Sequence, residues 1–159
     1  IHARKAWLKG LSPKQNREIP PLCYDKVYQI KSDRPDTPII INGGIKTLSE
    51  IDSHLNYVDG VMVGREAYRN PYLFNEIDTR YFGTTDAKLS RREVAKYMSE
   101  YIVRQYQLGA PPASISRHML GLFQHTHGAK IWRRHLTENA NQLQHSILIH
   151  RALAPMESS

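Results

Sequence analysis

The sequence predicts an α/β chain in which a parallel strand–helix–strand unit is followed by an all-helical module. Two short runs rich in β-branched residues, at 38–44 and 58–65, each stop at glycine, which is the pattern of fully buried strands in a parallel sheet. A helical pattern lies between them. From residue 90 onward the apolar residues follow helical spacing, so the second part is predicted to be a helical module.

Helices are expected on both sides of the first strand. The pattern over residues 24–34 predicts a helix that ends before Pro35. After the strand, Thr47 and Glu50 form a capping box for the next helix. Together these elements form one βαβ unit, for which a right-handed crossover is expected. A further helix is predicted over residues 71–81.

The second module begins after a linker at residues 83–89. Ser90 and Glu93 form another capping box, and the amphipathic helix that follows is closed by Gly109. Three shorter helices are predicted over residues 113–124, 129–139 and 143–153. We therefore expect two domains, at residues 1–85 and 86–159.

The composition excludes several classes of protein. A chain of 159 residues is long enough for one domain or two small ones. A mean hydropathy of -0.54 is typical of a soluble globular protein. The sequence holds no apolar run that could span a membrane and no secretion signal, so we expect a cytoplasmic location. Because the chain starts with Ile1 rather than Met, we expect a fragment of a longer protein.

The charge is unevenly distributed. The chain has 22 Lys and Arg against 15 Asp and Glu, a net charge of +7. Residues 1–85 hold 12 basic and 10 acidic side chains, whereas residues 86–159 hold 10 and 5. A basic module favours polyanions such as nucleic acid. The alternative is a solvated basic surface that keeps the protein in solution.

A phosphate site is predicted where the two strands end. Residues 42–44 (Asn-Gly-Gly) and the pair Gly64 and Arg65 follow neighbouring parallel strands. Glycine exposes its backbone N–H groups, the next helix contributes the positive end of its dipole, and arginine binds phosphate in a bidentate manner. In the alternative interpretation the glycines only form turns and Arg65 pairs with Glu66 or Asp59.

Two basic segments are candidates for contact with RNA. Residues 1–17 combine several cations with Trp7 and amide side chains, which suits an RNA backbone and a stacked base. In the helical module, Lys130, Arg133 and Arg134 share one helical face, while Ile131 and Leu136 are expected to point toward the core. Either segment alone is also compatible with a solvated surface.

His2 and Cys23 are further candidates for chemistry. His2 follows an apolar residue where a preceding strand would end, so its ring is a candidate donor to a cofactor oxygen. Cys23 lies before a predicted helix, away from the strand ends, and is interpreted as a structural thiol. The histidines lack the spacing of metal ligands, and we predict no metal site.

Four segments carry a resemblance to a known family. They are IHARKAWLKGLSPK (residues 1–14), INGGI (41–45), DGVMVGREA (59–67) and RHMLGLF (117–123). In order and spacing they resemble the bacterial tRNA-dihydrouridine synthases, specifically the A-type branch. The resemblance runs from residue 1 to about residue 150.

The resemblance implies the C-terminal portion of an FMN-dependent (β/α)8 TIM barrel, followed by an all-α helical-bundle domain that binds tRNA. This family reduces uridine in the D-loop of tRNA to 5,6-dihydrouridine, with NADPH as reductant of the FMN. The residues that match its FMN contacts are His2, Asn42, Gly43, Gly44, Gly64 and Arg65. Those that match its tRNA contacts are Lys14, Arg17, Lys130 and Arg133.

Part of the family pattern has no counterpart in this chain. A barrel needs about 250 residues, and the family's catalytic Cys and a flavin-binding Lys would lie upstream of Ile1. The position of Cys23 is not catalytic in the family, so no catalytic residue is assigned here. We expect the full-length protein to be the enzyme, acting as a monomer, and this chain alone to be inactive.

Two alternatives stay open at this point. Another FMN- or phosphate-binding barrel that reduces a small pyrimidine would share the two glycine turns, but it would not explain the basic helical module. A non-catalytic RNA-binding module would use Trp7, Trp132 and the basic faces without performing a reaction.

Overall fold

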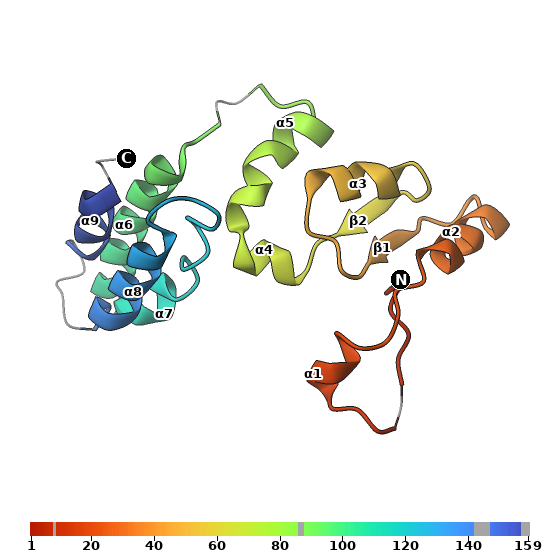
Figure 1. Ribbon diagram of the computed structural model, residues 1–159. Helices are drawn as coiled ribbons and strands as arrows, with labels where there is room; N and C mark the ends of the chain where they lie inside the picture. The colour runs from red at the N-terminus through yellow and green to blue at the C-terminus, as the bar shows by residue number, and fades with distance from the viewer. Residues whose placement is uncertain (8, 86–87, 142–146, 157–159) are drawn as a thin grey trace. The chain divides into compact units, whose positions relative to one another are not determined.

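The computed structural model describes residues 1–7, 9–85, 88–141 and 147–156. The chain forms two compact units, residues 1–66 and 67–159, and each is described by itself (Figure 1). No helix in the described ranges has both the length and the apolar character needed to cross a membrane.

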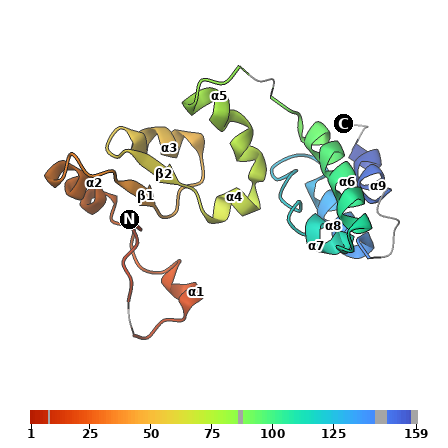
Figure 2. The same cartoon turned by 180° about the vertical axis from the view of Figure 1, so that it is seen from behind.

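The first unit is built on a small parallel sheet. Strand β1 (Ile40–Asn42) pairs with β2 (Gly60–Met62), with Ile41 opposite Val61. On the other side of β1, His2 forms a parallel bridge with Asn42, and the backbone N–H of Ala3 donates to the Asn42 carbonyl at 2.7 Å. The predicted parallel strand–helix–strand unit is therefore confirmed (Figure 2). Residues 1–3 add a third parallel segment through the His2–Asn42 bridge.

The described part of this unit has two helices of eight or more residues. They are α2 (Tyr24–Asp33) and α3 (Leu48–Leu55), and the expected capping box of Thr47 and Glu50 begins α3. Ile41 is fully buried, whereas Ile40 and Met62 are 54% and 48% exposed. The expectation of fully buried strands is therefore wrong, because in the described part of the chain these alternate side chains are not covered.

Residues 4–23 leave the sheet and return to it. Arg4 and Leu22 form an antiparallel bridge, which closes the base of the excursion. Farther out, the Asn16 side chain both accepts from the Trp7 N–H at 3.0 Å and donates to the Trp7 carbonyl at 2.8 Å. Asn16 is the last residue of the short helix α1 (Pro13–Asn16). Sequence periodicity did not predict this helix, although it starts with its own capping box.

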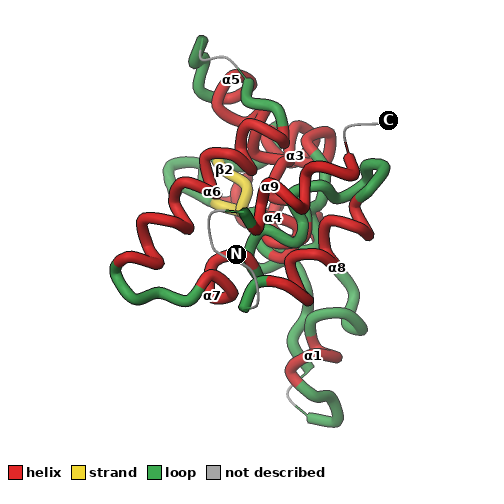
Figure 3. The backbone as a smooth tube through the Cα atoms, turned by 90° about the vertical axis from the view of Figure 1, so that its left-hand side faces the viewer, coloured by secondary structure: helices red, strands yellow, loops and turns green. Residues whose placement is uncertain are grey.

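The second unit is helical, and the tube in Figure 3 shows its helices in red. The elements are α4 (Arg65–Arg69), which begins at the end of the first unit, the 3₁₀ helix η1 (Pro71–Glu76), α5 (Ile77–Tyr81), α6 (Arg91–Gln107), α7 (Pro112–Ser116), α8 (Ala129–Asn139), α9 (Leu148–Leu153) and the 3₁₀ helix η2 (Ala154–Met156). The predictions for α6 and α8 are confirmed. The helix predicted over residues 71–81 is divided into η1 and α5.

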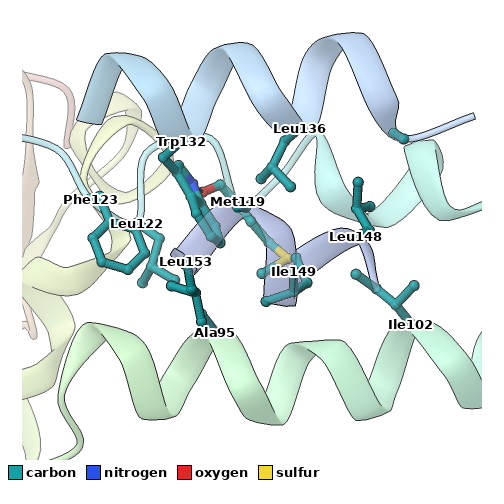
Figure 4. Packing of buried hydrophobic residues seen from close by; sticks show 12 residues of the cluster. Ala95, Ile102, Met119, Leu122, Phe123, Trp132, Leu136, Leu148, Ile149 and Leu153 are labelled. Carbon is teal, nitrogen blue, oxygen red and sulfur yellow. Dashed lines mark hydrogen bonds between the residues drawn. The ribbon is translucent and has the colours of Figure 1, made fainter. Parts of the chain in front are cut away.

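One hydrophobic core holds this unit together. Figure 4 shows Trp132 and Leu136 projecting from α8, with Ala95 and Ile102 contributed by α6. Trp132 and Ile102 are completely buried. The indole N–H of Trp132 donates to the Met119 carbonyl at 2.9 Å, so its polar atom is satisfied inside the core.

Two helix predictions in this unit need comment. The helix predicted over residues 113–124 is wrong beyond Ser116, because separate turns follow, in which the Met119 and Leu122 N–H groups each donate to the carbonyl three residues earlier. These turns bury Met119 and Leu122, which lie three positions apart, as one face of a helix would. The helix predicted over residues 143–153 is present as α9 from Leu148, and residues 143–146 lie outside the described ranges.

Contacts of residues 67–72 explain why the boundary between the two units falls after residue 66. A Cβ placed on Gly121 would lie 2.1 Å from the Arg69 carbonyl oxygen, so the two backbones touch directly. The guanidinium of Arg91 lies 4.0 Å from the centre of the Tyr72 ring. The sequence predicts a boundary after residue 85, whereas these contacts group residues 67–85 with the helical unit. The assignment of the two parts to a barrel and a tRNA-binding domain stays a prediction.

Candidate cofactor and RNA-binding sites

Three parallel segments end at one edge of the sheet in the first unit. His2, Asn42 and Met62 lie in register across the sheet, through the His2–Asn42 bridge and the pairing of Asn42 with Met62. The residues that follow, Gly43 and Gly44 after β1 and Gly64 and Arg65 after β2, therefore leave the sheet at the same edge. The structure thus brings together the candidate cofactor residues His2, Asn42, Gly43, Gly44, Gly64 and Arg65.

The His2 ring is oriented by its own backbone. Its Nδ1 accepts a hydrogen bond from the Arg4 backbone N–H at 3.1 Å, so the neutral ring carries its proton on Nε2. Burial lowers the pKa of His2 from its ordinary value of 6.5, and the positive charges of Arg4 and Arg65 lower it further. At neutral pH the side chain is therefore an uncharged Nε2–H donor.

The Gly43-Gly44 turn packs against residues that sequence reasoning missed. The two glycines have φ angles of 132° and 77°, a region that favours glycine. A Cβ on Gly44 would lie 2.8 Å from a methyl group of Leu22, and one on Gly43 would lie 3.3 Å from the His2 ring. The Tyr24 hydroxyl donates to the Gly43 carbonyl at 2.6 Å. Both Leu22 and Tyr24 reach the turn through long-range contacts, which leave no local sequence signal.

Gly64 differs from these two glycines. Its φ lies outside the left-handed region, and a Cβ would meet only the sulfur of Met62 at 3.8 Å, which is an ordinary contact. Neither the backbone nor the described surroundings therefore require glycine at this position. A glycine without a conformational reason is expected where a ligand approaches the backbone closely.

Arg65 has partners that were not expected. Its Nη1 donates to the Glu18 carboxylate and its Nη2 to the Arg17 carbonyl, each at 3.2 Å. The alternative in which Arg65 pairs with Glu66 or Asp59 is wrong, since Asp59 instead pairs with Lys31 at 2.8 Å and accepts from the Ile39 N–H. The Arg65–Glu18 pair is about half exposed.

The predicted contribution of the α3 helix dipole to phosphate binding needs correction. At the start of α3, the Glu50 carboxylate accepts from the backbone N–H groups of Lys46 and Thr47 at 2.7 and 2.9 Å. Burial raises the pKa of Glu50, but these hydrogen bonds outweigh it and the pKa is lowered overall. A carboxylate of the chain therefore already occupies this helix start, and the backbone turns and Arg65 are left to bind an anion.

Lys14 and Arg17 lie in the excursion formed by residues 4–23, and both are exposed. An open pocket of about 230 Å³ is lined by His2, Arg4, Lys5, Ala6, Asn16 and Arg17. His2 and Arg17 therefore line the same pocket, although one was expected to contact a cofactor and the other tRNA.

Lys130, Arg133 and Arg134 are exposed on α8, as their predicted common face requires. Leu136 is buried as expected, but Ile131 is 39% exposed, so its predicted position in the core is wrong. Trp132 is completely buried. It therefore offers no ring face for a nucleotide base, and that part of the RNA-module alternative is wrong.

The remaining candidates give no further site. Cys23 is half-buried, and its backbone N–H donates to the Ala3 carbonyl at 2.8 Å. The described residues contain no group of three or more His, Cys, Asp or Glu side chains that could hold a metal ion.

Comparison with known proteins identifies the family of this chain. The sequence profile of a family described as dihydrouridine synthase (Dus) matches residues 1–156. Curated relatives named tRNA-dihydrouridine(20/20a) synthase are similar to this chain over most of its length. That of Shewanella oneidensis is 56% identical over 142 residues, which are 89% of this chain and 42% of the relative.

Two further relatives carry the same name. The protein of Haemophilus ducreyi is 57% identical over 140 residues, covering 88% of this chain and 43% of the relative. That of Escherichia coli K12 is 54% identical over 142 residues, covering 89% and 41%. The chain thus spans about two fifths of the length of the curated relatives it matches.

Proposed function

The chain belongs to the dihydrouridine synthase family, and on this premise we propose that the protein reduces uridine to 5,6-dihydrouridine in the D-loop of tRNA. The relatives that share more than half of its residues are named for this modification. We further propose that residues 1–85 are the last part of a (β/α)8 barrel and that residues 86–159 bind tRNA. Cytoplasmic location and a monomeric state are part of the same proposal.

We propose FMN as the bound cofactor and NADPH as its reductant. The observation that carries this proposal is the common edge at which His2, the Gly43-Gly44 turn and the Gly64-Arg65 pair leave the sheet. Pockets of this kind, at the ends of neighbouring barrel strands, commonly hold phosphate groups. When bound, reduced FMN supplies the hydride that uridine accepts at C6.

The residues of this chain fit the parts of such a cofactor. Position 64 holds a glycine although neither its backbone conformation nor its neighbours require one. The missing Cβ leaves room for a phosphate group against the backbone. The neutral His2 ring presents an Nε2–H donor, which suits a carbonyl oxygen or ring nitrogen of the flavin. Arg65 supplies the positive charge that a phosphate group needs.

Arg65 is able to exchange partners. Its ion pair with Glu18 is exposed, and such pairs contribute about 0–1 kcal/mol. A phosphate oxygen pair accepts two charge-assisted hydrogen bonds from one guanidinium and is a stronger partner. Binding of a phosphate is therefore expected to draw Arg65 from Glu18 at small cost.

Binding of tRNA accounts for the basic residues that a small pyrimidine substrate leaves without a role. Lys14, Arg17, Lys130 and Arg133 are exposed, as contact with a phosphate backbone requires. The role of this chain in the reaction is therefore to bind the cofactor phosphate and to position the tRNA. We assign no catalytic residue to it, because Cys23 lies at the start of α2 and its backbone is tied to Ala3.

A hybrid enzyme tests the proposal. The matching segment of the Escherichia coli relative is replaced by the corresponding residues of this chain, and the hybrid is supplied with FMN, NADPH and unmodified tRNA. Mass spectrometry of the tRNA is expected to show dihydrouridine. Arg65→Gln in the hybrid should reduce retained FMN about tenfold, whereas Arg34→Gln, which removes the same charge from the end of α2, should leave it unchanged.

Two results would contradict the proposal. A folded, FMN-loaded hybrid that forms no dihydrouridine would rule out the assigned reaction. Reduction of FMN by NADPH on the isolated chain would show that the chain carries catalytic machinery that is not assigned here.

A further inference from the structure

A pocket of about 480 Å³ in the second unit brings three arginines together. Its lining includes Arg69 of α4, Arg117 at the end of α7 and Arg133 of α8, together with Tyr68, Gly121 and Gln124. Of the three arginines, only Arg133 was expected from the sequence to contact RNA.

The positive charge of this pocket is not compensated. Among the described residues, no carboxylate oxygen lies within 4.0 Å of any of the three guanidinium groups, and the lining contains no Asp or Glu. Like charges gathered in one pocket repel one another, so the arrangement is stabilised when an anion enters.

Arg117 is held in place by a closed set of hydrogen bonds. Its Nε donates to Nε2 of His118 at 3.1 Å, so the neutral His118 ring carries its proton on Nδ1. Nδ1 lies 3.0 Å from the Tyr68 hydroxyl, which in turn donates to the Arg117 carbonyl at 3.4 Å. Among the described residues only Nε of Arg117 has a side-chain partner, so its two terminal NH₂ groups are available to a ligand.

The other two arginines are also positioned by uncharged groups. Arg133 donates from Nη1 to the amide oxygen of Gln124 at 3.1 Å. The backbone of Arg69 is fixed by its direct contact with Gly121, where even a Cβ would not fit. Uncharged groups thus orient the side chains of Arg117 and Arg133 without neutralising them, and a backbone contact fixes the position of Arg69.

We propose that Arg69, Arg117 and Arg133 form a binding site for a phosphodiester of the RNA backbone. The proposal rests on the proposed function, in which tRNA is the partner. A phosphodiester carries one negative charge and two free oxygens, which match the paired NH groups of a guanidinium. The pocket is also large enough for the adjoining ribose. Such a contact positions the RNA and reads no base, so it should act equally on all tRNA sequences.

The test measures how the affinity of the 159-residue chain for unmodified tRNA depends on NaCl concentration. Arg69→Gln and Arg117→Gln are each expected to weaken binding about tenfold at 0.1 M NaCl. Each should also lower the slope of log affinity against log salt by about one, as expected for one lost phosphate contact. Arg151→Gln on α9 is the matched control, because it removes the same charge from the same unit outside the pocket.

A second variant separates charge from geometry. Arg117→Lys keeps the charge but loses the planar fork and the Nε contact with His118, so it should retain the salt slope and still lose affinity. Circular dichroism of each variant checks that the helical unit is folded.

The possible outcomes distinguish the two proposals. If the unaltered chain binds tRNA while Arg69→Gln and Arg117→Gln behave like Arg151→Gln, the pocket proposal is overturned and the proposed function stands. If the unaltered chain does not bind tRNA at all, the pocket proposal is overturned together with the assignment of tRNA binding to residues 86–159, whereas the proposed reaction is decided separately by the hybrid enzyme.

Discussion

Arg65 donates a hydrogen bond from Nη2 to the backbone carbonyl oxygen of Arg17 at 3.2 Å. The same guanidinium donates from Nη1 to Glu18. A side chain proposed to bind the cofactor phosphate is therefore attached to the segment that carries the proposed tRNA contacts Lys14 and Arg17. In the proposed function, cofactor binding and the position of this segment are therefore linked through Arg65.

Removal of this link should loosen the excursion. Arg65→Gln loses two exposed contacts, together worth about 1 kcal/mol, and the segment should open about five times more often. Trypsin is then expected to cleave after Lys14 and Arg17 about fivefold faster, since proteolysis of an open state follows its population. Arg34→Gln serves as the control, and equal cleavage rates in the two variants would contradict the role of Arg65.

Gly64 and Gly44 should respond differently to alanine. Gly64→Ala meets only an ordinary contact, so we expect a change of less than about 0.5 kcal/mol in the free energy of unfolding. In the hybrid enzyme the same change should release FMN. Gly44→Ala faces a positive φ and a Leu22 methyl group at 2.8 Å, and should destabilise the chain by about 1–3 kcal/mol. Urea unfolding and FMN fluorescence measure the two effects, and FMN retained by Gly64→Ala would contradict the phosphate assignment.

Gly121→Ala is expected to be the more damaging of two glycine substitutions in the helical unit. The added Cβ would lie 2.1 Å from the Arg69 carbonyl oxygen, so the backbones must separate, at a cost of about 3 kcal/mol or more. Gly109→Ala is the control, because its φ is positive but no atom lies within 4 Å of the new Cβ, and about 1 kcal/mol is expected. Thermal unfolding monitored at 222 nm compares the two, and equal losses would exclude the close contact.

The two tryptophans should differ in their effect on stability. Trp132→Phe removes one of the two hydrogen bonds to the Met119 carbonyl, which keeps the one from the Leu122 N–H, and opens a small cavity in the core. Together these changes should cost about 1–3 kcal/mol. Trp7 is 45% exposed, and Trp7→Phe should change the free energy of unfolding by less than about 0.5 kcal/mol. Urea denaturation followed by circular dichroism measures both, and a large loss only for Trp7→Phe would reverse the assignment of core and surface.

The first unit should become less stable in mild acid because of His54. Its ring is buried beside Tyr24, and its Nδ1 lies 2.7 Å from the Tyr28 hydroxyl. Burial lowers the pKa of His54 below 6.5, so the unfolded chain takes up the proton first as the pH falls. The stabilisation is complete above pH 6.5 and is lost as the pH falls from there through the lower folded-state value.

His54→Gln provides the comparison for this pH dependence. Urea unfolding at pH 7.5 and pH 5.5 should show a smaller loss of stability in the variant than in the unaltered chain. An equal loss in both would assign the pH dependence to other groups, such as His2, whose pKa is lowered in the same way.

The sequence by itself determined the elements whose signals are local. The capping boxes of Thr47 with Glu50 and Ser90 with Glu93 are present as predicted, because both partners lie within one helical turn. The two strands were identified from their composition and their closing glycines. The common location of the candidate cofactor residues was also predictable, because the ends of neighbouring parallel strands lie at one edge of a sheet.

Only the tertiary structure decided which distant groups meet. Arg65 contacts Glu18, 47 positions away, and Gly121 touches the backbone of Arg69, yet no local pattern marks either pair. Trp132 is buried because it packs in the single core of the helical unit. The helix α7 ends early because the turns that follow it bury Met119 and Leu122 as well as a helix would. Local propensities set where helices and strands begin, whereas long-range packing and hydrogen bonding set which side chains are exposed, which partner each charge finds, and which arginines share a pocket.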